Sequence, residues 1–298
     1  MSIRHLLDIT DLTPGELRHV LALSVAAPKR VLDGEGVALI FEKPSNRTRH
    51  SMEMAVVQLG GHPIYTRGEE IGFDTRETVE DITRIMSGYH GVLAARVFAH
   101  DTVTRMAACS KVPVVNMLSD RSHPLQALAD VITMKEHCGP IDDLVVAWVG
   151  DYNNVARSLA EAVLMLGGTM SFGCPVGYDA SAAELARLAE LGGSVSQTDD
   201  PHAAAAGAHV VHTDTWISMG QEEESAARRK VFSSYIVDST LMGAAAPGAK
   251  FMHCMPAHRG EEVSADVFDG ENSLVIAQGH HRLTAARGAL TFVKEASR

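Results

Sequence analysis

Short apolar runs alternate with helical segments along most of the chain, and no other feature limits the possible folds as strongly. Residues 37–41 form one such run, Pro44 follows it, and the next apolar side chains recur at the spacing of one helix face. A run of this length before a turn predicts a buried strand. Strands that alternate with helices in this way predict parallel sheets covered by helices, so the chain is predicted to be an α/β protein.

The same pattern extends through both halves of the chain. Strands are predicted over residues 37–41, 62–65, 91–95, 112–116, 144–149, 169–172, 209–212 and 250–253. Helices are predicted over residues 79–86, 180–191, 203–206 and about 281–294, and the polar residues 66–78 are predicted to form a loop. Cys138, Gly139 and Pro140 break a helix between the halves, which predicts two doubly wound parallel-sheet domains, residues 1–138 and 141–278.

The composition is that of a soluble globular enzyme. Hydrophobic residues make up 46% and charged residues 21% of the 298 residues, as is ordinary for a chain of two domains. The 26 basic and 37 acidic side chains leave a net charge of −11, which argues against a nucleic-acid-binding surface. No apolar stretch has the length needed to span a membrane, and the first residues lack the features of a signal peptide.

The cysteines and histidines indicate neither a disulfide framework nor a metal centre. Cys109, Cys138, Cys174 and Cys254 are far apart in the sequence, which favours a reduced, cytoplasmic protein. The 15 histidines follow no zinc-ligand spacing, so no metal is expected.

The turn after residues 37–41 concentrates groups that bind anions. Ser45 is predicted to cap the following helix, and the free backbone N–H groups at a helix start favour an anion. Thr48 adds a hydroxyl donor, and Arg47 and Arg49 add guanidinium groups that fit phosphate oxygens. The alternative is a capped helix with two solvated arginines. We favour phosphate binding because four such side chains fall so close together.

A second polar pair lies at the start of another predicted helix. His123 and Gln126 are three positions apart, so their side chains can converge on one point. A neutral histidine donates one N–H, and a glutamine offers both a donor and an acceptor. The alternative is a capping histidine beside a surface glutamine, which these two residues taken alone favour.

Polar residues also follow the strands of the second half. The turn after residues 144–149 lacks the G-x-G-x-x-G spacing of a dinucleotide site, and Asn154 could instead hold a small polar substrate. Asp214 and Cys254 each follow a strand, where side chains face the crevice at the edge of a parallel sheet. Arg282 is predicted to lie at the start of the last helix, where its guanidinium could reach an anion.

Four motifs occur in a fixed order along the chain. They are Ser45-Asn46-Arg47-Thr48-Arg49, His123-Pro124-Leu125-Gln126, Asp214-Thr215-Trp216-Ile217-Ser218-Met219-Gly220 and His253-Cys254-Met255-Pro256. Together they resemble the carbamoyltransferase family, and the last two resemble the motifs of its ornithine branch. The resemblance implies two α/β domains joined by helices, a C-terminal helix (residues 279–298) that returns to the first domain, and a homotrimer.

The resemblance also implies a role for particular residues. Carbamoyl-phosphate binding is implied for Ser45, Asn46, Arg47, Thr48, Arg96, His123, Gln126, Cys254, Met255 and Arg282. L-Ornithine binding is implied for Asn154, Asp214, Ser218 and Met219, and catalytic roles are implied for Arg96, His123, Asp214 and Cys254.

The expected reaction transfers the carbamoyl group to the δ-amine of ornithine and gives citrulline and phosphate. It needs no covalent enzyme intermediate and no metal or organic cofactor. One alternative is a transferase for a related amine, such as putrescine or an N-acylated ornithine, against which Ser218-Met219-Gly220 argues. Another is a non-catalytic relative, against which the presence of Arg47, His123 and Arg282 argues.

Overall fold

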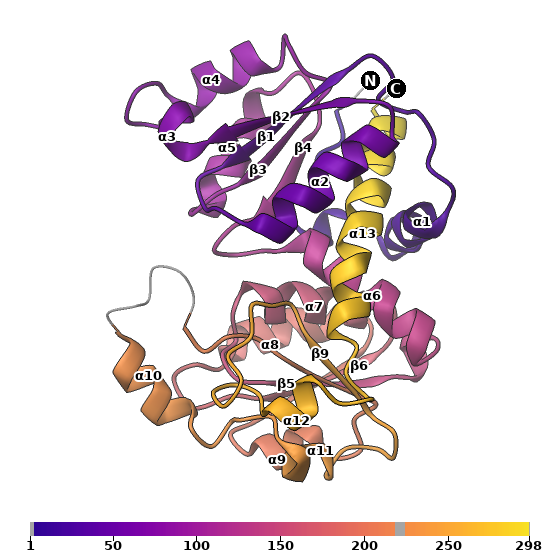
Figure 1. Ribbon diagram of the computed structural model, residues 1–298, viewed down its shortest axis with the longest axis vertical. Coiled ribbons are helices and arrows are strands. Elements are labelled where there is room, and N and C mark those ends of the chain that lie inside the picture. The colour runs from indigo at the N-terminus through magenta and orange to yellow at the C-terminus, as the bar shows by residue number, and fades with distance from the viewer. Residues whose placement is uncertain (1–2, 218–223, 298) are drawn as a thin grey trace. The chain divides into compact units, whose positions relative to one another are not determined.

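The chain forms two compact units in a computed structural model that describes residues 3–217 and 224–297. Unit 1 comprises Met1–Ala129 with His280–Arg298, and unit 2 comprises Asp130–Gly279. Each unit is built on its own parallel sheet (Figure 1). The boundary falls inside the helix α6 (Pro124–His137), whereas the sequence prediction put it after that helix, at residues 138–140.

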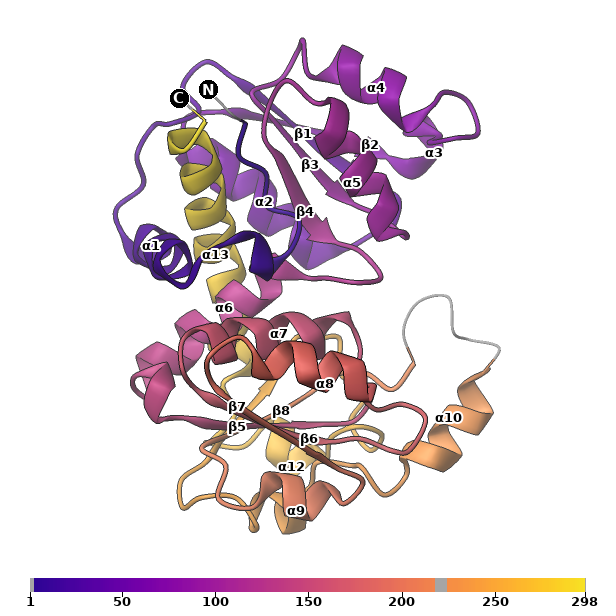
Figure 2. The same ribbon diagram turned by 180° about the vertical axis from the view of Figure 1, so that it is seen from behind.

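Unit 1 holds a four-stranded parallel sheet in the order β2-β1-β3-β4. The strands are β1 (Gly36–Phe41), β2 (His62–Arg67), β3 (Val92–Arg96) and β4 (Val114–Leu118). The helices α4 (Val79–Met86) and α5 (His100–Cys109) cover one face, and α2 (Asn46–Gln58) lies on the other (Figure 2). Because helices cover both faces, the two central strands are apolar along almost their whole length.

The C-terminal helix α13 (Val275–Glu295) packs in unit 1 against α1 (Pro14–Val25). The approach is so close that a Cβ added at Gly288 would lie 2.0 Å from Ser24 Oγ. Arg287 donates a hydrogen bond to the Ser24 carbonyl at 2.9 Å, and Lys294 pairs with Glu35 at 2.6 Å. The predicted return of the C-terminal helix to the first domain is confirmed.

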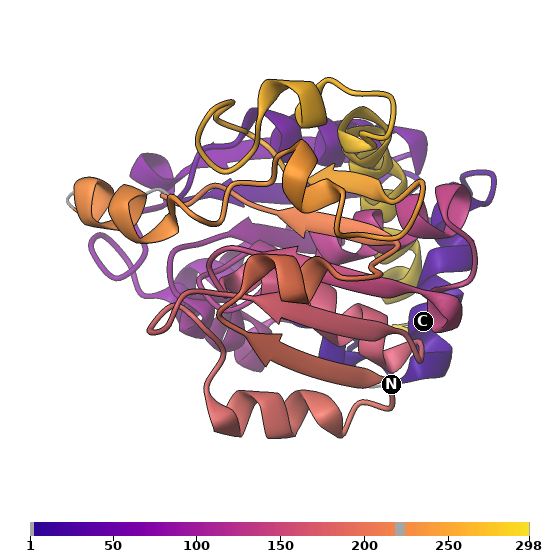
Figure 3. The same cartoon turned by 90° about the horizontal axis from the view of Figure 1, so that it is seen from below.

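Unit 2 holds a five-stranded parallel sheet in the order β7-β6-β5-β8-β9, whose arrows point the same way in Figure 3. The strands are β5 (Val145–Val149), β6 (Thr169–Gly173), β7 (Ser194–Thr198), β8 (Val210–Thr213) and β9 (Lys250–His253). The helices α7 (Asn154–Met165) and α8 (Ala182–Ala189) lie on one side of the sheet. On the other side lie α9 (Pro201–Ala205), α11 (Ser239–Met242) and α12 (Ala265–Phe268).

The remaining elements are short. They are α3 (Gly68–Ile71), α10 (Ser225–Phe232) and two 3₁₀ turns, η1 (Ile9–Asp11) and η2 (Ile141–Asp143). Within the described ranges, no helix combines the length and the apolar character needed to cross a membrane.

The structure corrects several sequence predictions. Residues 66–78, predicted to be a loop, hold the end of β2 and the helix α3, which is too short to show a helical period. The helix α5 and the strand β7 were not predicted, and β7 is a half-exposed edge strand with few apolar residues. The helix α13 begins at Val275, so Arg282 lies about two turns inside it and not at its start.

Candidate functional site

The turn between β1 and α2 presents a capped helix start. Ser45 is the N-cap residue, as predicted, and its Oγ accepts a hydrogen bond from the Thr48 backbone N–H at 3.4 Å. Asn46 is exposed, and Arg47, on the first turn of α2, is half-buried. The turn therefore keeps the side chains of Asn46 and Arg47 beside a helix N-terminus, which suits an anion.

Arg49 does not share this environment. Its guanidinium pairs with Glu53 one turn further along α2, at 2.8 Å, and lies over the Tyr65 ring at 3.9 Å from the ring centre. Arg49 was one of the two arginines predicted to face phosphate. Its side chain instead lies along the surface of α2, where it pairs with Glu53.

Arg282 joins three separate segments of unit 1. Its Nη2 donates a hydrogen bond to Thr48 Oγ1 at 3.0 Å, its Nη1 donates to Gln126 Oε1, and Nη1 lies 3.4 Å from His123 Nε2. All four side chains are buried. Packing of α13 on unit 1 therefore brings a guanidinium to the N-terminal turns of two other helices, α2 and α6.

Thr48 is the central acceptor of this cluster. Its Oγ1 accepts hydrogen bonds from Ser45 Oγ at 3.1 Å, from Arg282, and from Arg96 Nη1 at 3.5 Å. Arg96 is the last residue of β3 and is also buried. Because guanidinium groups only donate, the hydroxyl proton of Thr48 can point toward a ligand oxygen.

His123 is held neutral. Burial, followed by the nearby charges of Arg282 and Arg96, lowers the pKa of His123 well below 6.5. Since Arg282 can only donate, Nε2 of the neutral ring faces it as an acceptor and Nδ1 carries the proton. Gln126 is 1% exposed, so the alternative of a surface glutamine is wrong.

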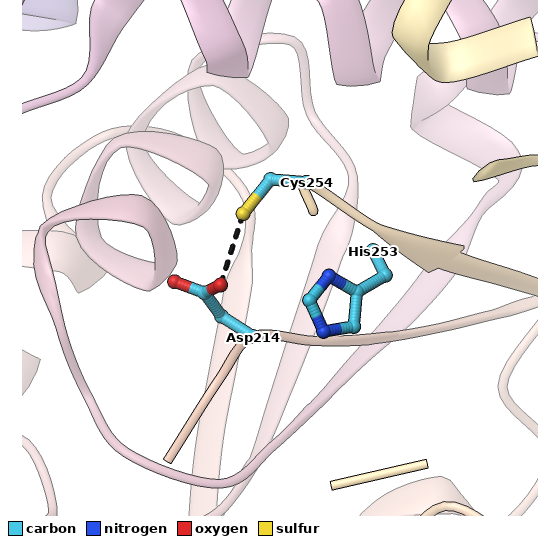
Figure 4. Close-up of side chains that lie close together, drawn as sticks. All are labelled: Asp214, His253 and Cys254. Carbon is cyan, nitrogen blue, oxygen red and sulfur yellow. Dashed lines mark hydrogen bonds between the residues drawn. The ribbon is translucent and has the colours of Figure 1, made fainter. Parts of the chain in front are cut away.

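Asp214 is the central acceptor of a second cluster, in unit 2. Its Oδ1 accepts hydrogen bonds from Cys254 Sγ at 3.0 Å and from the Thr215 backbone N–H at 2.8 Å. Its Oδ2 accepts one from Asn153 Nδ2 at 2.9 Å. Figure 4 shows the thiol and the carboxylate facing each other beside the ring of His253. Three donors thus orient a half-buried carboxylate at the ends of β8 and β9.

The sequence pattern indicates Asn154, whereas the structure shows that its neighbour Asn153 contacts Asp214. Asn153 caps α7 by accepting hydrogen bonds from the N–H groups of Val155 and Ala156, and the other end of its amide reaches Asp214. Asn154, the first residue of α7, is half-buried. An Asn-Asn pair at a helix start is the one signal that could have indicated Asn153, because Asn is a favoured N-cap residue.

The segment after β9 is held by its own histidine. Met255 takes a left-handed backbone conformation with φ of 58°, and its N–H donates to His253 Nδ1 at 2.8 Å. His253 Nε2 lies 3.1 Å from Glu262 Oε1. Ligand-type atoms of Asp214, His253 and Cys254 lie within 4.8 Å of one another, but each ring nitrogen of His253 is already in a hydrogen bond, which a metal bound at that nitrogen would break.

The structure therefore brings eight of the predicted residues into two clusters. In unit 1 these are Ser45, Thr48, Arg96, His123, Gln126 and Arg282. In unit 2 they are Asp214 and Cys254. Ser218 and Met219 lie outside the described residues.

Sequence models of one family match nearly the whole chain. The carbamoyl-phosphate-binding domain of aspartate/ornithine carbamoyltransferases matches residues 4–136, and the Asp/Orn-binding domain of the same family matches residues 142–293. The chain belongs to the aspartate/ornithine carbamoyltransferase family. The resemblance that the four motifs carried is thereby confirmed.

Individual members of this carbamoyltransferase family are similar over their full length. The ornithine carbamoyltransferase of Acidothermus cellulolyticus is 44% identical over 99% of this chain and 98% of its own length. The structure of the ornithine carbamoyltransferase from Pyrococcus furiosus has a TM-score of 0.94 and 41% identity, and covers 100% of this chain and 99% of its own. An N-acetyl-L-ornithine transcarbamylase structure has a TM-score of 0.87 at 25% identity, over 97% of this chain and 99% of its own.

Proposed function

We propose that the chain transfers the carbamoyl group of carbamoyl phosphate to the δ-amine of L-ornithine, which gives L-citrulline and phosphate. The contact of one guanidinium, Arg282, with Thr48, His123 and Gln126 carries this proposal. It joins cationic, hydroxyl and imidazole groups at helix starts, where a phosphate and a carbonyl oxygen can be bound together. Membership of the family and the names of the relatives support it.

In this proposal unit 1 binds and activates carbamoyl phosphate. Arg47 and the N–H groups of the turn hold the phosphate, which leaves with the electron pair of the C–O bond that breaks. The Thr48 hydroxyl, Arg96 and the Nδ1–H of neutral His123 stabilise the carbamoyl oxygen as it becomes an oxyanion. Burial strengthens these hydrogen bonds because little water competes for them.

Unit 2 binds and orients the amine. The δ-amine has a solution pKa close to that of lysine, about 10.4, so it arrives as an ammonium ion. The Asp214 carboxylate pairs with that charge, and the ammonium must release a proton to water before its nitrogen attacks the carbamoyl carbon. Asp214 and Cys254 orient the nitrogen lone pair, and no step requires a cofactor.

We propose the following residues as contacts of the two substrates. Carbamoyl phosphate contacts Ser45, Asn46, Arg47, Thr48, Arg96, His123, Gln126, Cys254, Met255 and Arg282; ornithine contacts Asn154, Asp214, Ser218 and Met219. The carbamoyl-phosphate domain is proposed to comprise residues 1–138 with 279–298 and the ornithine domain residues 141–278, which differ from units 1 and 2 mainly in placing all of α6 with the first domain.

A substrate panel tests the proposed function. Product formation is measured with carbamoyl phosphate and, in parallel, L-ornithine, putrescine, N-acetylornithine and aspartate. We expect kcat/KM for ornithine to exceed that for each other amine by at least about a hundredfold, the effect of roughly 3 kcal/mol of transition-state binding. A higher kcat/KM for N-acetylornithine or putrescine would make that amine the substrate in place of ornithine. Absence of product with every amine would indicate that the chain is a non-catalytic relative.

We also propose a homotrimer in the cytoplasm. The trimer rests on the family resemblance, and light scattering that gives an active monomer of 31.9 kDa would exclude it. The location is supported by the four cysteines, none of which forms a disulfide in the described residues, as is usual in a reducing compartment.

A further inference from the structure

A buried glutamine of unit 2 links the ends of β8 and β9. Gln278 lies in the first turn of α13 and is 1% exposed. Its Oε1 accepts a hydrogen bond from the His253 backbone N–H at 2.9 Å. Its Nε2 donates to Asp130 Oδ1 at 2.7 Å and lies 3.0 Å from His212 Nε2. The carbonyl and the amino group of this amide therefore both have partners.

The partners determine which way the amide and the ring of His212 are oriented. A backbone N–H only donates, so the oxygen of Gln278 must face His253. His212 Nδ1 lies 3.1 Å from the Thr213 carbonyl, which only accepts, so Nδ1 carries the proton of the neutral ring. His212 Nε2 is then the acceptor for Gln278. The His212 ring is also stacked on Trp148 at 5.0 Å, which keeps it in place.

His253 has the opposite tautomer. Its Nδ1 accepts the Met255 N–H, so its Nε2 carries the proton and donates to Glu262. Burial alone would raise the pKa of Glu262, but hydrogen bonds from His253 and His258 lower it overall. A charged Glu262 therefore holds the His253 side chain while Gln278 holds the His253 backbone.

These contacts lie one residue before the proposed amine-binding groups. Thr213 and His253 are paired in the register of β8 and β9. Asp214 and Cys254 follow them directly, and their 3.0 Å hydrogen bond depends on both strand ends staying in place. Gln278 contacts both strands at this level, through the side chain of His212 and the backbone of His253.

We propose that Gln278 is a positioning residue that holds Asp214 and Cys254 together for the amine substrate, an inference that rests on the proposed function. Gln278 does not touch the substrate in this account. Its effect should therefore fall mainly on the use of ornithine, because only Cys254 and Met255, of the ten residues proposed to contact carbamoyl phosphate, follow the strand end that Gln278 holds.

The variant Gln278→Met keeps the length of the side chain and removes its polar atoms. We expect its KM for ornithine to rise at least tenfold while its KM for carbamoyl phosphate, which Cys254 and Met255 also contact in the proposal, rises by less than about threefold. The matched control is Gln197→Met. Gln197 also uses both ends of its amide, with Ala180 and Asp179, but lies in β7, at the opposite edge of the same sheet. Its two KM values should not change.

The kinetic result can contradict the proposal in two ways. Equal changes in both KM values would make Gln278 a general structural residue. A lowered melting temperature with both KM values unchanged would do the same, and the melting curve of Gln197→Met provides the reference for losing a glutamine amide.

Two measurements need no substrate, so they decide the proposal even if the proposed function fails, and the first also needs no variant, so it applies even if Gln278→Met does not fold. In the unaltered chain, ¹⁵N NMR should find His212 protonated on Nδ1 and His253 on Nε2, and the opposite tautomer of either would overturn the proposal. In folded Gln278→Met, alkylation of Cys254 by iodoacetamide should be at least threefold faster, because the Asp214 carboxylate opposes thiolate formation when the two are held together. An unchanged rate would also overturn it. Absence of citrulline from the unaltered chain would instead refute the proposed function alone.

Discussion

The Arg282 guanidinium donates a hydrogen bond to Thr48 Oγ1 at 3.0 Å, although the two residues are 234 positions apart. The same guanidinium bonds to Gln126, so its two Nη atoms serve two different helices. A lysine could keep the charge at this place but could not make both contacts, because its ammonium is a single point on a flexible stem.

We therefore expect Arg282→Lys to weaken carbamoyl-phosphate binding about ten- to a hundredfold, the effect of losing a charge-assisted hydrogen bond worth roughly 1.5–3 kcal/mol. Isothermal calorimetry of the folded variant measures it. The control is Arg287→Lys on the same helix, since Arg287 bonds only to structural partners such as Gln58 and the Ser24 carbonyl. Equal carbamoyl-phosphate affinities in the two variants would show that Arg282 does not bind the phosphate.

Asp214→Asn keeps the size of the side chain and removes its charge. It should lower kcat/KM for ornithine about ten- to a hundredfold, or roughly 1.5–3 kcal/mol, and leave carbamoyl-phosphate affinity within a few-fold. Asp214 also accepts the Thr215 N–H, so a structural role must be separated from binding. Asp238→Asn is the control, because Asp238 caps α11 and should affect stability alone. Equal losses for both substrates with a lowered melting temperature would defeat the ornithine-binding role.

The neutral state of His123 predicts how stability depends on pH. Its folded pKa lies well below the ordinary value of 6.5, so the unfolded chain binds more protons as the pH falls through 6.5. The folded state should therefore lose stability from about pH 6.5 downward, by up to about 1.4 kcal/mol per pH unit for this group. Burial also lowers the pKa of His5, His90 and His100, which adds losses of the same sign.

Denaturant unfolding at pH 7.0 and 5.5 measures this loss. In His123→Gln, which cannot be protonated, the difference between the two pH values should be smaller by about 1.4 kcal/mol. An identical difference in both proteins would mean that His123 is not held neutral by the fold.

How far the sequence predicts this site depends on where each residue lies. Ser45 and Asp214 can be selected from the sequence because a strand followed by a helix start, or by a polar residue, leaves a local pattern. The position of Arg282 inside α13 was predicted wrongly, because Val275 and Ile276 give too short an apolar signal before Gln278, Gly279 and two histidines.

Partners that are distant in sequence left no local signal. Nothing near Gln278 indicates that its amide bonds to His212 and His253, since a polar residue at a helix start is usually solvated. Asn153 and Asn154 are chemically identical neighbours, and only the geometry of the cap separates them. The roles of Gln278 and Asn153 can be inferred only when their tertiary contacts are known.

The close packing of α13 on α1 also makes a prediction about stability. A Cβ at Gly288 would lie 2.0 Å from Ser24 Oγ and 2.8 Å from the Ser24 backbone, so Gly288→Ala should destabilise unit 1 by about 1–3 kcal/mol. At Gly15, at the start of α1, a Cβ would meet, among the described residues, only Thr13 Oγ1, at 4.0 Å, so Gly15→Ala should be neutral or stabilising, because alanine favours the helix. The melting temperature of Gly288→Ala should therefore be lower than that of the unaltered chain, and the melting temperature of Gly15→Ala should be equal or higher. An unchanged melting temperature of Gly288→Ala would contradict the close packing of α13 on α1.

The reaction itself can be observed directly by ¹³C NMR with carbamoyl phosphate labelled at its carbonyl carbon. With the chain and L-ornithine present, we expect the labelled carbon to become bonded to the δ-nitrogen as citrulline, with one phosphate released for each citrulline formed. Loss of the label at the rate of uncatalysed breakdown, or phosphate release without citrulline, would contradict the central claim.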